Sequence, residues 1–328
     1  MVESSLLFLS GLGAALLLGA LLIPWLRKLK IGQQIRSDGP KSHQSKAGTP
    51  TMGGLIFIMS AIVAWAIYRL LTGTGVTVEE VMIMGFPALY AAVGFIDDFR
   101  KVRRGRSLGL RAREKMALQI LFAALFVYAA ESMGRGTYLI LPWSRATIDL
   151  GALYGVFGVL VIVSAGNAVN LTDGLDGLAA GTVLIALGAY YVIGRAAGSA
   201  LGLFGICGPV AVWGGAILGF LAYNRHPAKV FMGDTGSNAL GALLASIAIL
   251  TRTEVVLIFI AGIPVIETLS DIVQVASFQL LGKRVFKMAP IHHHFELSGW
   301  PETKIVAVFW VAQAIFALLG IASMAMVP

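Results

Sequence analysis

The chain has 328 residues, of which 57% are hydrophobic and only 13% are charged, and its mean hydropathy is +0.83. Soluble domains carry about 25% charged residues, so the composition predicts an integral membrane protein that crosses the bilayer several times. The net charge of +8 does not indicate nucleic-acid binding, because so apolar a chain leaves no soluble domain to hold the basic residues. The single cysteine, Cys207, excludes intrachain disulfides and any site built from several thiolates.

Ten apolar segments are long enough to cross a bilayer, which takes roughly twenty residues. The first follows an acidic flank at Glu3 and precedes the positive charge, so we expect a retained helix rather than a secretory signal. Pro264 interrupts the ninth segment, which predicts a kinked or broken helix that shapes a lipid-facing groove, with Glu267 just beyond the proline. The fold class is therefore an all-α polytopic membrane protein. Its expected spans are residues 4–26, 50–71, 80–96, 113–132, 151–168, 177–195, 199–222, 237–251, 255–280 and 304–327.

The placement of lysine and arginine predicts the orientation of these helices. The loops after the odd-numbered segments carry 20 of the 25 basic residues. By the positive-inside rule these loops are cytoplasmic, and both termini face outward. We expect one transmembrane catalytic domain, residues 1–328, with the active site on its cytoplasmic face. The five loops expected to form that site are residues 27–49, 97–115, 169–175, 223–235 and 281–304.

Two motifs place carboxylates at the membrane edge, where they are costly and usually functional. Asp97 and Asp98 end the third segment, and such a pair needs a cation or a basic neighbour; a solvated helix end is the structural alternative. In "NLTDGLDG", Asn170, Asp173 and Asp176 are three residues apart, which predicts one face of a short helix. An N-capped turn would account for one of these aspartates but not for both.

Two further motifs suggest phosphate and magnesium binding. In "FMGDTGS", Asp234 stands between glycines just before a helix, where it is either an N-cap or a candidate Mg²⁺ ligand. A helix N-terminus with Thr and Ser donors also favours phosphate. "SKAGTPTMGG" supplies Lys46 and Thr51 before the second segment; it resembles a phosphate-binding loop but lacks Walker spacing.

Three consecutive histidines stand in "KMAPIHHHFELSGW". Neighbouring side chains diverge by about 100° on a helix, so His292, His293 and His294 do not converge on one tetrahedral zinc ion, and no nearby cysteine completes a set. We expect one or two of them to face the cleft and bind an anion or a base, and the others to pack or to bond to the backbone.

Together these motifs resemble the phospho-N-acetylmuramoyl-pentapeptide transferase family, within the polyprenyl-phosphate N-acetylhexosamine-1-phosphate transferase superfamily. The resemblance runs from about Lys41 to Trp310, and "MAPIHHHFELSGWPE" is similar to the muramoyl-pentapeptide branch. It implies transfer from UDP-N-acetylmuramoyl-pentapeptide to undecaprenyl phosphate, giving lipid I and UMP with Mg²⁺ as cofactor. It also implies a homodimer in the bacterial inner membrane.

The resemblance implies roles for individual residues as well. Asp97, Asp98 and Asp234 are similar to catalytic positions, with Asp234 as the Mg²⁺ ligand and Asp97 orienting or deprotonating the lipid phosphate. Phe231 is similar to a residue that stacks on uracil. The full set implied to bind substrate is Lys46, Thr51, Lys101, Asn170, Asp173, Asp176, Phe231, His292, His293 and His294.

Two alternatives remain on the sequence alone. A sibling enzyme that uses another UDP-N-acetylhexosamine shares the carboxylate motifs, and the histidine motif is what distinguishes it. A cation-coupled transporter is the alternative from another class. Against the transporter, the acidic residues gather at one face of the membrane, and the sequence shows no internal repeat.

Overall fold

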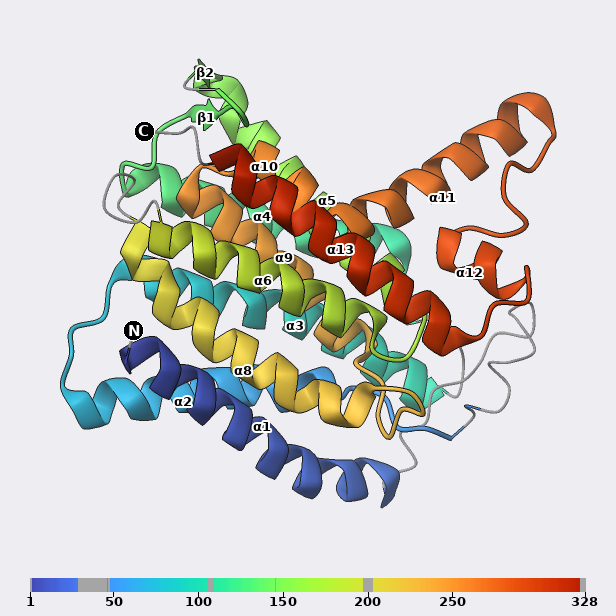
Figure 1. Ribbon diagram of the computed structural model, residues 1–328, viewed down its shortest axis with the longest axis horizontal. Helices are drawn as coiled ribbons and strands as arrows, with labels where there is room; N and C mark the ends of the chain where they lie inside the picture. The colour runs from blue at the N-terminus through green and yellow to red at the C-terminus, as the bar shows by residue number, and fades with distance from the viewer. Residues whose placement is uncertain are drawn as a thin grey trace.

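Long apolar helices make up most of the computed structural model, which describes residues 2–28, 46, 48–104, 109–144, 146–196 and 203–324 (Figure 1). Its α-helices are α1 (Val2–Lys28), α2 (Gly54–Thr72), α3 (Val78–Arg104), α4 (Ala112–Ser132), α5 (Tyr154–Thr172), α6 (Leu178–Ala196), α8 (Cys207–Asn224), α9 (Gly233–Thr251), α10 (Glu254–Ile260), α11 (Gly262–Leu281), α12 (Ile291–Glu296) and α13 (Glu302–Met324). Two short 3₁₀ helices, Gly151–Leu153 and Leu203–Ile206, and two strands, β1 (Tyr138–Ile140) and β2 (Thr147–Asp149), complete the described elements.

The polytopic helical fold is confirmed, and each of the ten expected segments overlaps a helix. Within the described ranges, eight helices are long and apolar enough to cross a membrane, and the bent pair α10–α11 would make nine. The helix α9, which corresponds to the eighth expected segment, is outside that group because its first turn, "GDTGSN", is polar. Ten crossings and outward-facing termini therefore stay predictions.

The helix α9 lies in the middle of the bundle, where it packs against α3 and α5. Sixteen of its 19 residues are buried, so it is covered on all sides by other helices. Small residues along "GSNALGALLAS" allow those neighbours to come close. The N-terminal turn of α9, which carries Asp234, is consequently held inside a ring of helix ends.

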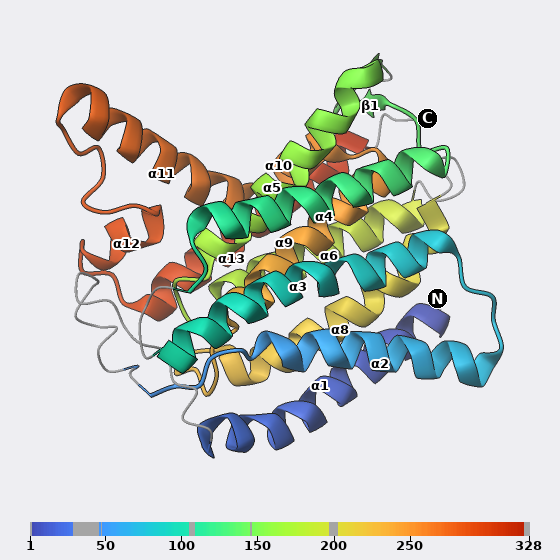
Figure 2. The same cartoon turned by 180° about the vertical axis from the view of Figure 1, so that it is seen from behind.

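The predicted break in the ninth segment is confirmed: α10 and α11 meet at an angle of 89°. The break is at Ala261, and Pro264 lies in the first turn of α11, where a proline needs no helical hydrogen-bond donor. Gln313 of α13 satisfies the backbone there, because it donates to the Ile260 carbonyl at 2.5 Å and accepts from the Ile263 N–H at 3.0 Å. Figures 1 and 2 show α11 projecting from the bundle beyond this bend.

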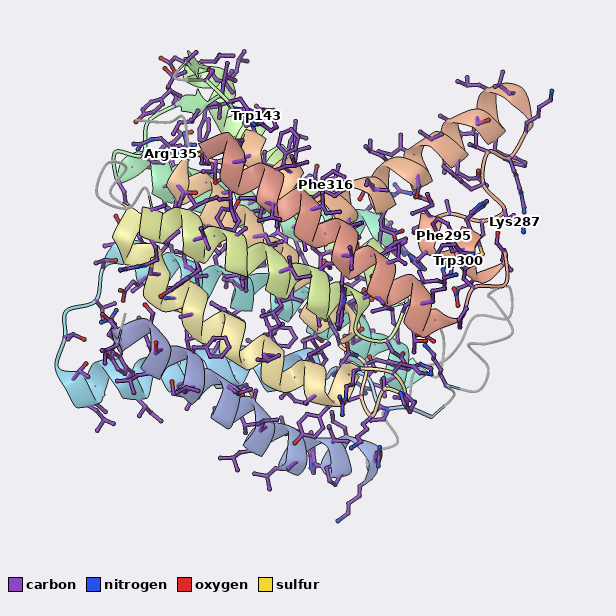
Figure 3. All side chains as sticks on the ribbon, in the orientation of Figure 1. Arg135, Trp143, Lys287, Phe295, Trp300 and Phe316 are labelled. Atoms are coloured by element: carbon purple, nitrogen blue, oxygen red, sulfur yellow. The ribbon has the colours of Figure 1, made fainter. Side chains whose placement is uncertain are left out.

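A short antiparallel hairpin of β1 and β2 was not predicted from the sequence. Its strands have three residues each, too few to give a recognisable alternation. Arg135 anchors it: the guanidinium donates to the Ile249 carbonyl at 2.7 Å and the Tyr138 carbonyl at 3.0 Å, and it pairs with the buried Glu254. Figure 3 labels Arg135 and Trp143 at this end of the molecule, away from Lys287 and its neighbours.

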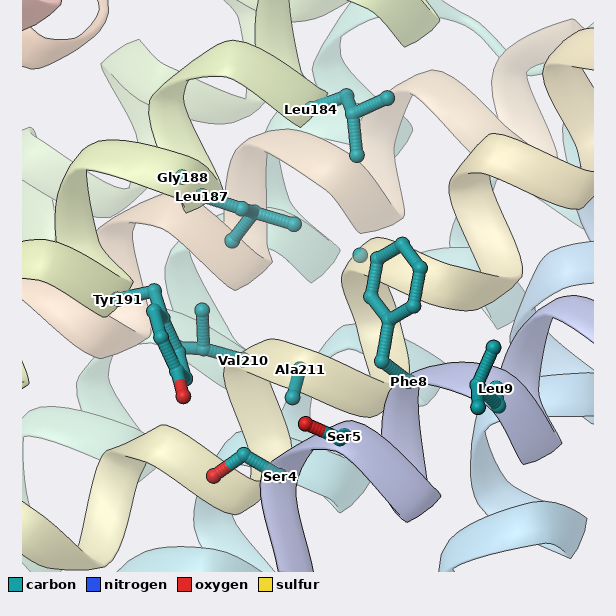
Figure 4. Close-up of a pocket in the computed structure, with 11 residues that line it drawn as sticks. Ser4, Ser5, Phe8, Leu9, Leu184, Leu187, Gly188, Tyr191, Val210 and Ala211 are labelled. Atoms are coloured by element: carbon teal, nitrogen blue, oxygen red, sulfur yellow. The ribbon is translucent and has the colours of Figure 1, made fainter. Parts of the chain in front are cut away.

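A cavity of about 480 Å³ opens between α1, α6 and α8 (Figure 4). Apolar side chains such as Phe8 and Leu187 form most of its wall, with hydroxyl groups from Ser4, Ser5 and Tyr191. It is formed by the first turns of α1 and α8, whereas the acidic motifs lie at the opposite ends of the helices. The cavity is therefore separate from the candidate site described below.

Replacing Gln313 tests the account of the helix break. Gln313→Leu leaves the Ile260 carbonyl and the Ile263 N–H without partners, so we expect the free energy of unfolding to fall by about 1–3 kcal/mol. Thermal unfolding of the purified protein in detergent measures this. Thr182→Val is the control, since the buried Thr182 hydroxyl bonds only to its own helix. An equal loss in both variants would refute the bridging role.

Candidate active site

The third segment and the "FMGDTGS" motif meet where α3 crosses the start of α9. Gly94 makes the contact possible, since a Cβ there would lie 2.0 Å from the Asp234 carbonyl oxygen. Asp97 and Asp98, which follow Gly94 by three and four residues, reach the first turn of α9. Oxygen atoms from Asp97, Asp98 and Asp234 all lie within 4.8 Å of one another, so the structure brings together the three predicted catalytic carboxylates.

The buried Asp98 carboxylate caps the N-terminus of α9. It accepts hydrogen bonds from the N–H groups of Asp234 at 3.2 Å and Thr235 at 2.9 Å, and from the Thr235 hydroxyl at 2.7 Å. These bonds satisfy donors that a helix start leaves unpaired, and the positive end of the helix dipole favours the charge. The cap of α9 is thus supplied by another helix, and the Asp234 carboxylate is not used for it.

Two lysines offset the three negative charges. Lys101 lies 2.5 Å from Asp97 and 3.2 Å from Asp234, and Lys115 lies 2.8 Å from Asp234. Opposite charges this close favour the ionised carboxylates. Asp97 also accepts the Leu110 N–H at 2.6 Å, which holds the segment before α4 against the end of α3.

Asn170 completes the surroundings of Asp234. Its amide donates to one carboxylate oxygen of Asp234 at 3.0 Å and to the Ser237 hydroxyl at 2.8 Å, while the lysines contact the other oxygen. Mg²⁺ prefers oxygen ligands and usually takes one or two of them from carboxylates. The cluster of Asp97, Asp98 and Asp234 therefore fits a hard divalent cation, whereas the lysines mark the places where phosphate oxygens would be attracted.

The prediction that Asn170, Asp173 and Asp176 share one helix face is wrong. The helix α5 ends at Thr172, and the chain then turns through Gly177, whose φ of +79° requires glycine. As a result Asn170 points to Asp234, and Asp176 belongs to a second cluster. Asp173 lies between them, and its carboxylate makes no hydrogen bond within the part of the chain that the structure describes.

The second cluster joins Lys46, Asp176, His226 and Glu302. Lys46 lies 2.7 Å from Asp176 and 2.6 Å from Glu302. Burial lowers the pKa of Lys46, but hydrogen bonds to the two carboxylates outweigh this and leave the pKa above its ordinary value. Asp176 also accepts from the Ala228 N–H at 3.0 Å and contacts His226 at 3.1 Å. Lys46 is thus held as a cation beside the 173–177 turn.

Thr51 and Phe231 lie where two motifs pair through their backbones. The Phe231 N–H donates to the Pro50 carbonyl, and the Gly53 N–H donates to the Phe231 carbonyl, both at 2.8 Å. Thr51 is buried beside Gly233, and Phe231 is half-buried. These bonds place residues 50–54 next to Phe231 and Met232, as the predicted convergence of loops requires.

The three histidines lie on the short helix α12, with the His292 and His293 ring centroids 4.1 Å apart, and within the described ranges none of them belongs to a group of side chains placed to hold a metal ion. The His292 ring is buried: Nδ1 lies 3.0 Å from Glu267, and Nε2 faces Gly174 in the 173–177 turn. His293 contacts Glu296 at 2.7 Å, and His294 accepts the Lys287 N–H at 3.2 Å. His292 is therefore the member of the triplet nearest the aspartate motif.

Glu267 lies just beyond Pro264, and its side chain is fully buried. The residue lies one turn beyond the break, on the side of α11 that faces the bundle. A carboxylate there needs a partner, and His292 supplies it.

Comparisons with known proteins agree with this geometry. The chain matches glycosyl transferase family 4 over residues 80–252 and phospho-N-acetylmuramoyl-pentapeptide-transferase signature 1 over residues 46–58. It is 49% identical over 326 residues to the phospho-N-acetylmuramoyl-pentapeptide-transferase of Shouchella clausii, with 98% of each chain covered. The chain belongs to the phospho-N-acetylmuramoyl-pentapeptide transferase family.

Other members of the family are similar to the same degree. The Anoxybacillus flavithermus transferase is 47% identical over 325 residues, with 98% of both chains covered, and the Geobacillus kaustophilus transferase is 50% identical over 304 residues, with 93% and 92% covered. The family signature includes Lys46 and Thr51, and the glycosyl transferase region includes the three clustered carboxylates. The histidine motif lies outside both matched regions.

The sequence alone did not identify four residues of the site: Lys115, His226, Glu302 and Thr235. Lys115 was one of eight basic residues in loop 97–115, and nothing local distinguishes it from charges that set the topology. Glu302 lies inside the quoted motif "GWPE", but its partners are 256 and 126 residues away in the chain. Such contacts follow from the fold and leave no local signal.

The position of Asp173 predicts a dependence of stability on pH. Burial and the charges of Asp234 and Asp98 raise the pKa of Asp173 above its usual value of about 3.9. The folded state then binds the proton more tightly than the unfolded state, so this carboxyl contributes stability at low pH that is lost as pH rises. In EDTA, we expect Asp173→Asn to match the wild type near pH 4 and to become more stable than the wild type as pH rises.

Asp149→Asn is the control for this experiment. A hydrogen bond from Thr137 and another from the Gly151 N–H lower the pKa of Asp149, so its contribution has the opposite sign. The Asp149→Asn variant should not gain stability over the wild type between pH 4 and neutral. Thermal unfolding at several pH values measures both variants, and parallel pH curves for Asp173→Asn and the wild type would contradict the prediction.

Proposed function

We propose that the chain transfers phospho-N-acetylmuramoyl-pentapeptide from its UDP-activated form to undecaprenyl phosphate, giving lipid I and UMP. The observation that carries this proposal is the meeting of three carboxylates and two lysines at one end of a bundle of apolar helices. A relative that is 49% identical to the chain over nearly its whole length carries the name of this activity. A site of this kind serves one membrane-bound and one water-soluble phosphate substrate.

The reaction exchanges one phosphoanhydride for another. An oxygen of the lipid phosphate attacks the β-phosphorus of the nucleotide sugar, and the bond from that phosphorus to the oxygen bridging the two phosphates breaks, so UMP leaves. A phosphate monoester has a second pKa of about 6, so at neutral pH the nucleophile is already largely deprotonated. Catalysis then consists of positioning and charge neutralisation, which Lys101 and Lys115 would supply next to Asp234.

Asp234 and Asp97 are the proposed ligands of Mg²⁺. Asp98 is engaged with the first turn of α9, which leaves the other two carboxylates to face the substrate phosphates. A bound Mg²⁺ would neutralise charge on the diphosphate and orient it. Asp97 also holds Lys101 at 2.5 Å, so we assign it the role of orienting the lipid phosphate rather than removing a proton.

The second cluster is the proposed nucleotide side. Lys46 and Thr51 would contact phosphate or ribose, and Phe231 would stack on uracil, since its ring is half-buried beside them. Asp173 and Asp176, in the turn that joins the clusters, would accept hydroxyl groups from the sugar. His293, next to this turn on α12, would face the diphosphate and the sugar, while the buried His292 ring packs against the turn and His294 supports the motif through its contact with the Lys287 backbone.

The proposed orientation puts this end of the bundle in the cytoplasm of a bacterium, with both termini outside and the protein in the inner membrane. The support is the distribution of basic residues, 20 of 25 of which fall in the loops at this end. The whole chain, residues 1–328, would form one catalytic domain, and a homodimer is expected from the family.

The decisive experiment measures UMP. Purified protein in detergent is incubated with Mg²⁺, undecaprenyl phosphate and one UDP-sugar at a time. UMP released only with UDP-N-acetylmuramoyl-pentapeptide supports the proposal. Release with UDP-N-acetylglucosamine instead would select the sibling enzyme, and no release with any sugar would favour the transporter.

Lys115 offers a second test of the proposed function, because its place beside Asp234 follows from the structure and was not predicted from the sequence. Removing one preorganised charge that acts on the reacting phosphates costs about 10²–10³ in kcat, so we expect Lys115→Met to lower the rate of UMP release by roughly 100-fold. The matched control is Lys283→Met, which removes an exposed lysine from the same end of the molecule. Equal rates for Lys115→Met and the control would remove Lys115 from the site.

A further inference from the structure

A second polar layer lies one helical turn deeper in the bundle than the carboxylate cluster. Gln119 follows Lys115 by four residues on α4, and Asn238 follows Asp234 by four residues on α9. Residues four apart share a helix face, so each amide lies directly behind the charged group of its own helix. Asn167 of α5 joins the same layer.

The three amides form a chain of hydrogen bonds with one direction. Asn167 donates to the Gln119 side-chain oxygen at 3.1 Å, and Gln119 donates to the Asn238 side-chain oxygen at 2.8 Å. Asn238 then donates to the main-chain carbonyl of Asp234 at 2.7 Å. Gln119 and Asn238 are fully buried. This series of hydrogen bonds therefore ends, shielded from water, at the main-chain carbonyl of Asp234.

The same layer joins every helix that supplies a charge to the cluster. Tyr90 of α3, the helix of Asp97 and Asp98, donates to the main-chain carbonyl of Gln119 at 2.8 Å. The buried amides of Gln119 and Asn238 cost desolvation free energy that apolar side chains of the same size would avoid. What the amides provide in return is a fixed distance between α4 and the first turn of α9.

We propose that the amide chain Asn167–Gln119–Asn238 is a positioning element that sets the affinity of the Asp97–Asp98–Asp234 cluster for a divalent cation. The amides touch neither cation nor substrate and act through the backbone of Asp234. Partners behind a metal ligand typically change metal affinity by about 10–100-fold when they are replaced. The inference rests on the proposed function only in that it takes the cluster to be a cation site.

The test measures Mn²⁺ binding to the purified full chain in detergent by electron paramagnetic resonance. The component of binding lost in Asp234→Asn defines the cluster. Asn238→Leu leaves the Gln119 amide N–H without an acceptor, so we expect lower thermal stability and about tenfold weaker Mn²⁺ binding. Gln119→Leu/Asn238→Leu removes both partners and should recover most of the stability, but it should not recover the Mn²⁺ affinity.

Ser246→Ala is the matched control on α9, since the buried Ser246 hydroxyl bonds only to the Leu243 carbonyl of its own helix. It should bind Mn²⁺ as the wild type does. The inference is overturned by wild-type affinity in Asn238→Leu, by recovery of affinity in the double variant, or by the lack of any Mn²⁺ component that depends on Asp234. Because no turnover is measured, weakened Mn²⁺ binding together with no UMP release would refute the proposed function and leave this inference standing.

Discussion

The candidate site depends on one contact, the capping of α9 by Asp98 of α3. Three donors of the first turn of α9 converge on this buried carboxylate. The contact fixes the end of one helix against the start of another, and Gly94 allows the two backbones to meet. Asp97 and Asp234 become neighbours as a result, although 137 positions separate them in the numbering. Repulsion among three acids would separate the helices without Lys101 and Lys115, so fold and electrostatics are mutually dependent here.

Two clusters, joined by the 173–177 turn, divide the chemistry of the site between them. One holds acidic residues and lysines around Asp234, which suits reacting phosphates and a cation. The other holds Lys46 between Asp176 and Glu302, which fixes a cation beside the 173–177 turn. Since both substrates of the proposed reaction are already phosphorylated, neither cluster has to generate a strong nucleophile. Rigid placement of charges is sufficient, and the buried hydrogen bonds provide it.

Much of this arrangement could be predicted from the sequence. Apolar segments located the helices, the charge bias grouped five loops at one end, and Pro264 marked the region of the broken helix. Local patterns are enough for such features because each depends on neighbours in the chain. The error over Asn170, Asp173 and Asp176 arose because α5 ends at Thr172 and the chain turns through Gly177, whereas the three-residue spacing is that of a continuous helix. The roles of Asp98, Lys115 and Glu302 depend on partners more than a hundred residues away, which no local pattern records.

The contact between Glu267 and His292 links the membrane to the site. Leu269, Ile272 and Phe278 are exposed along α11, the arm that extends from the bundle (Figure 1). Glu267, near the base of the same arm, holds the His292 ring against the turn that carries Asp173. A sideways movement of this arm within the lipid must either break a buried ionisable pair or pull the ring with it. The Glu267–His292 contact is thus one path by which the position of the exposed arm bears on the position of the 173–177 turn.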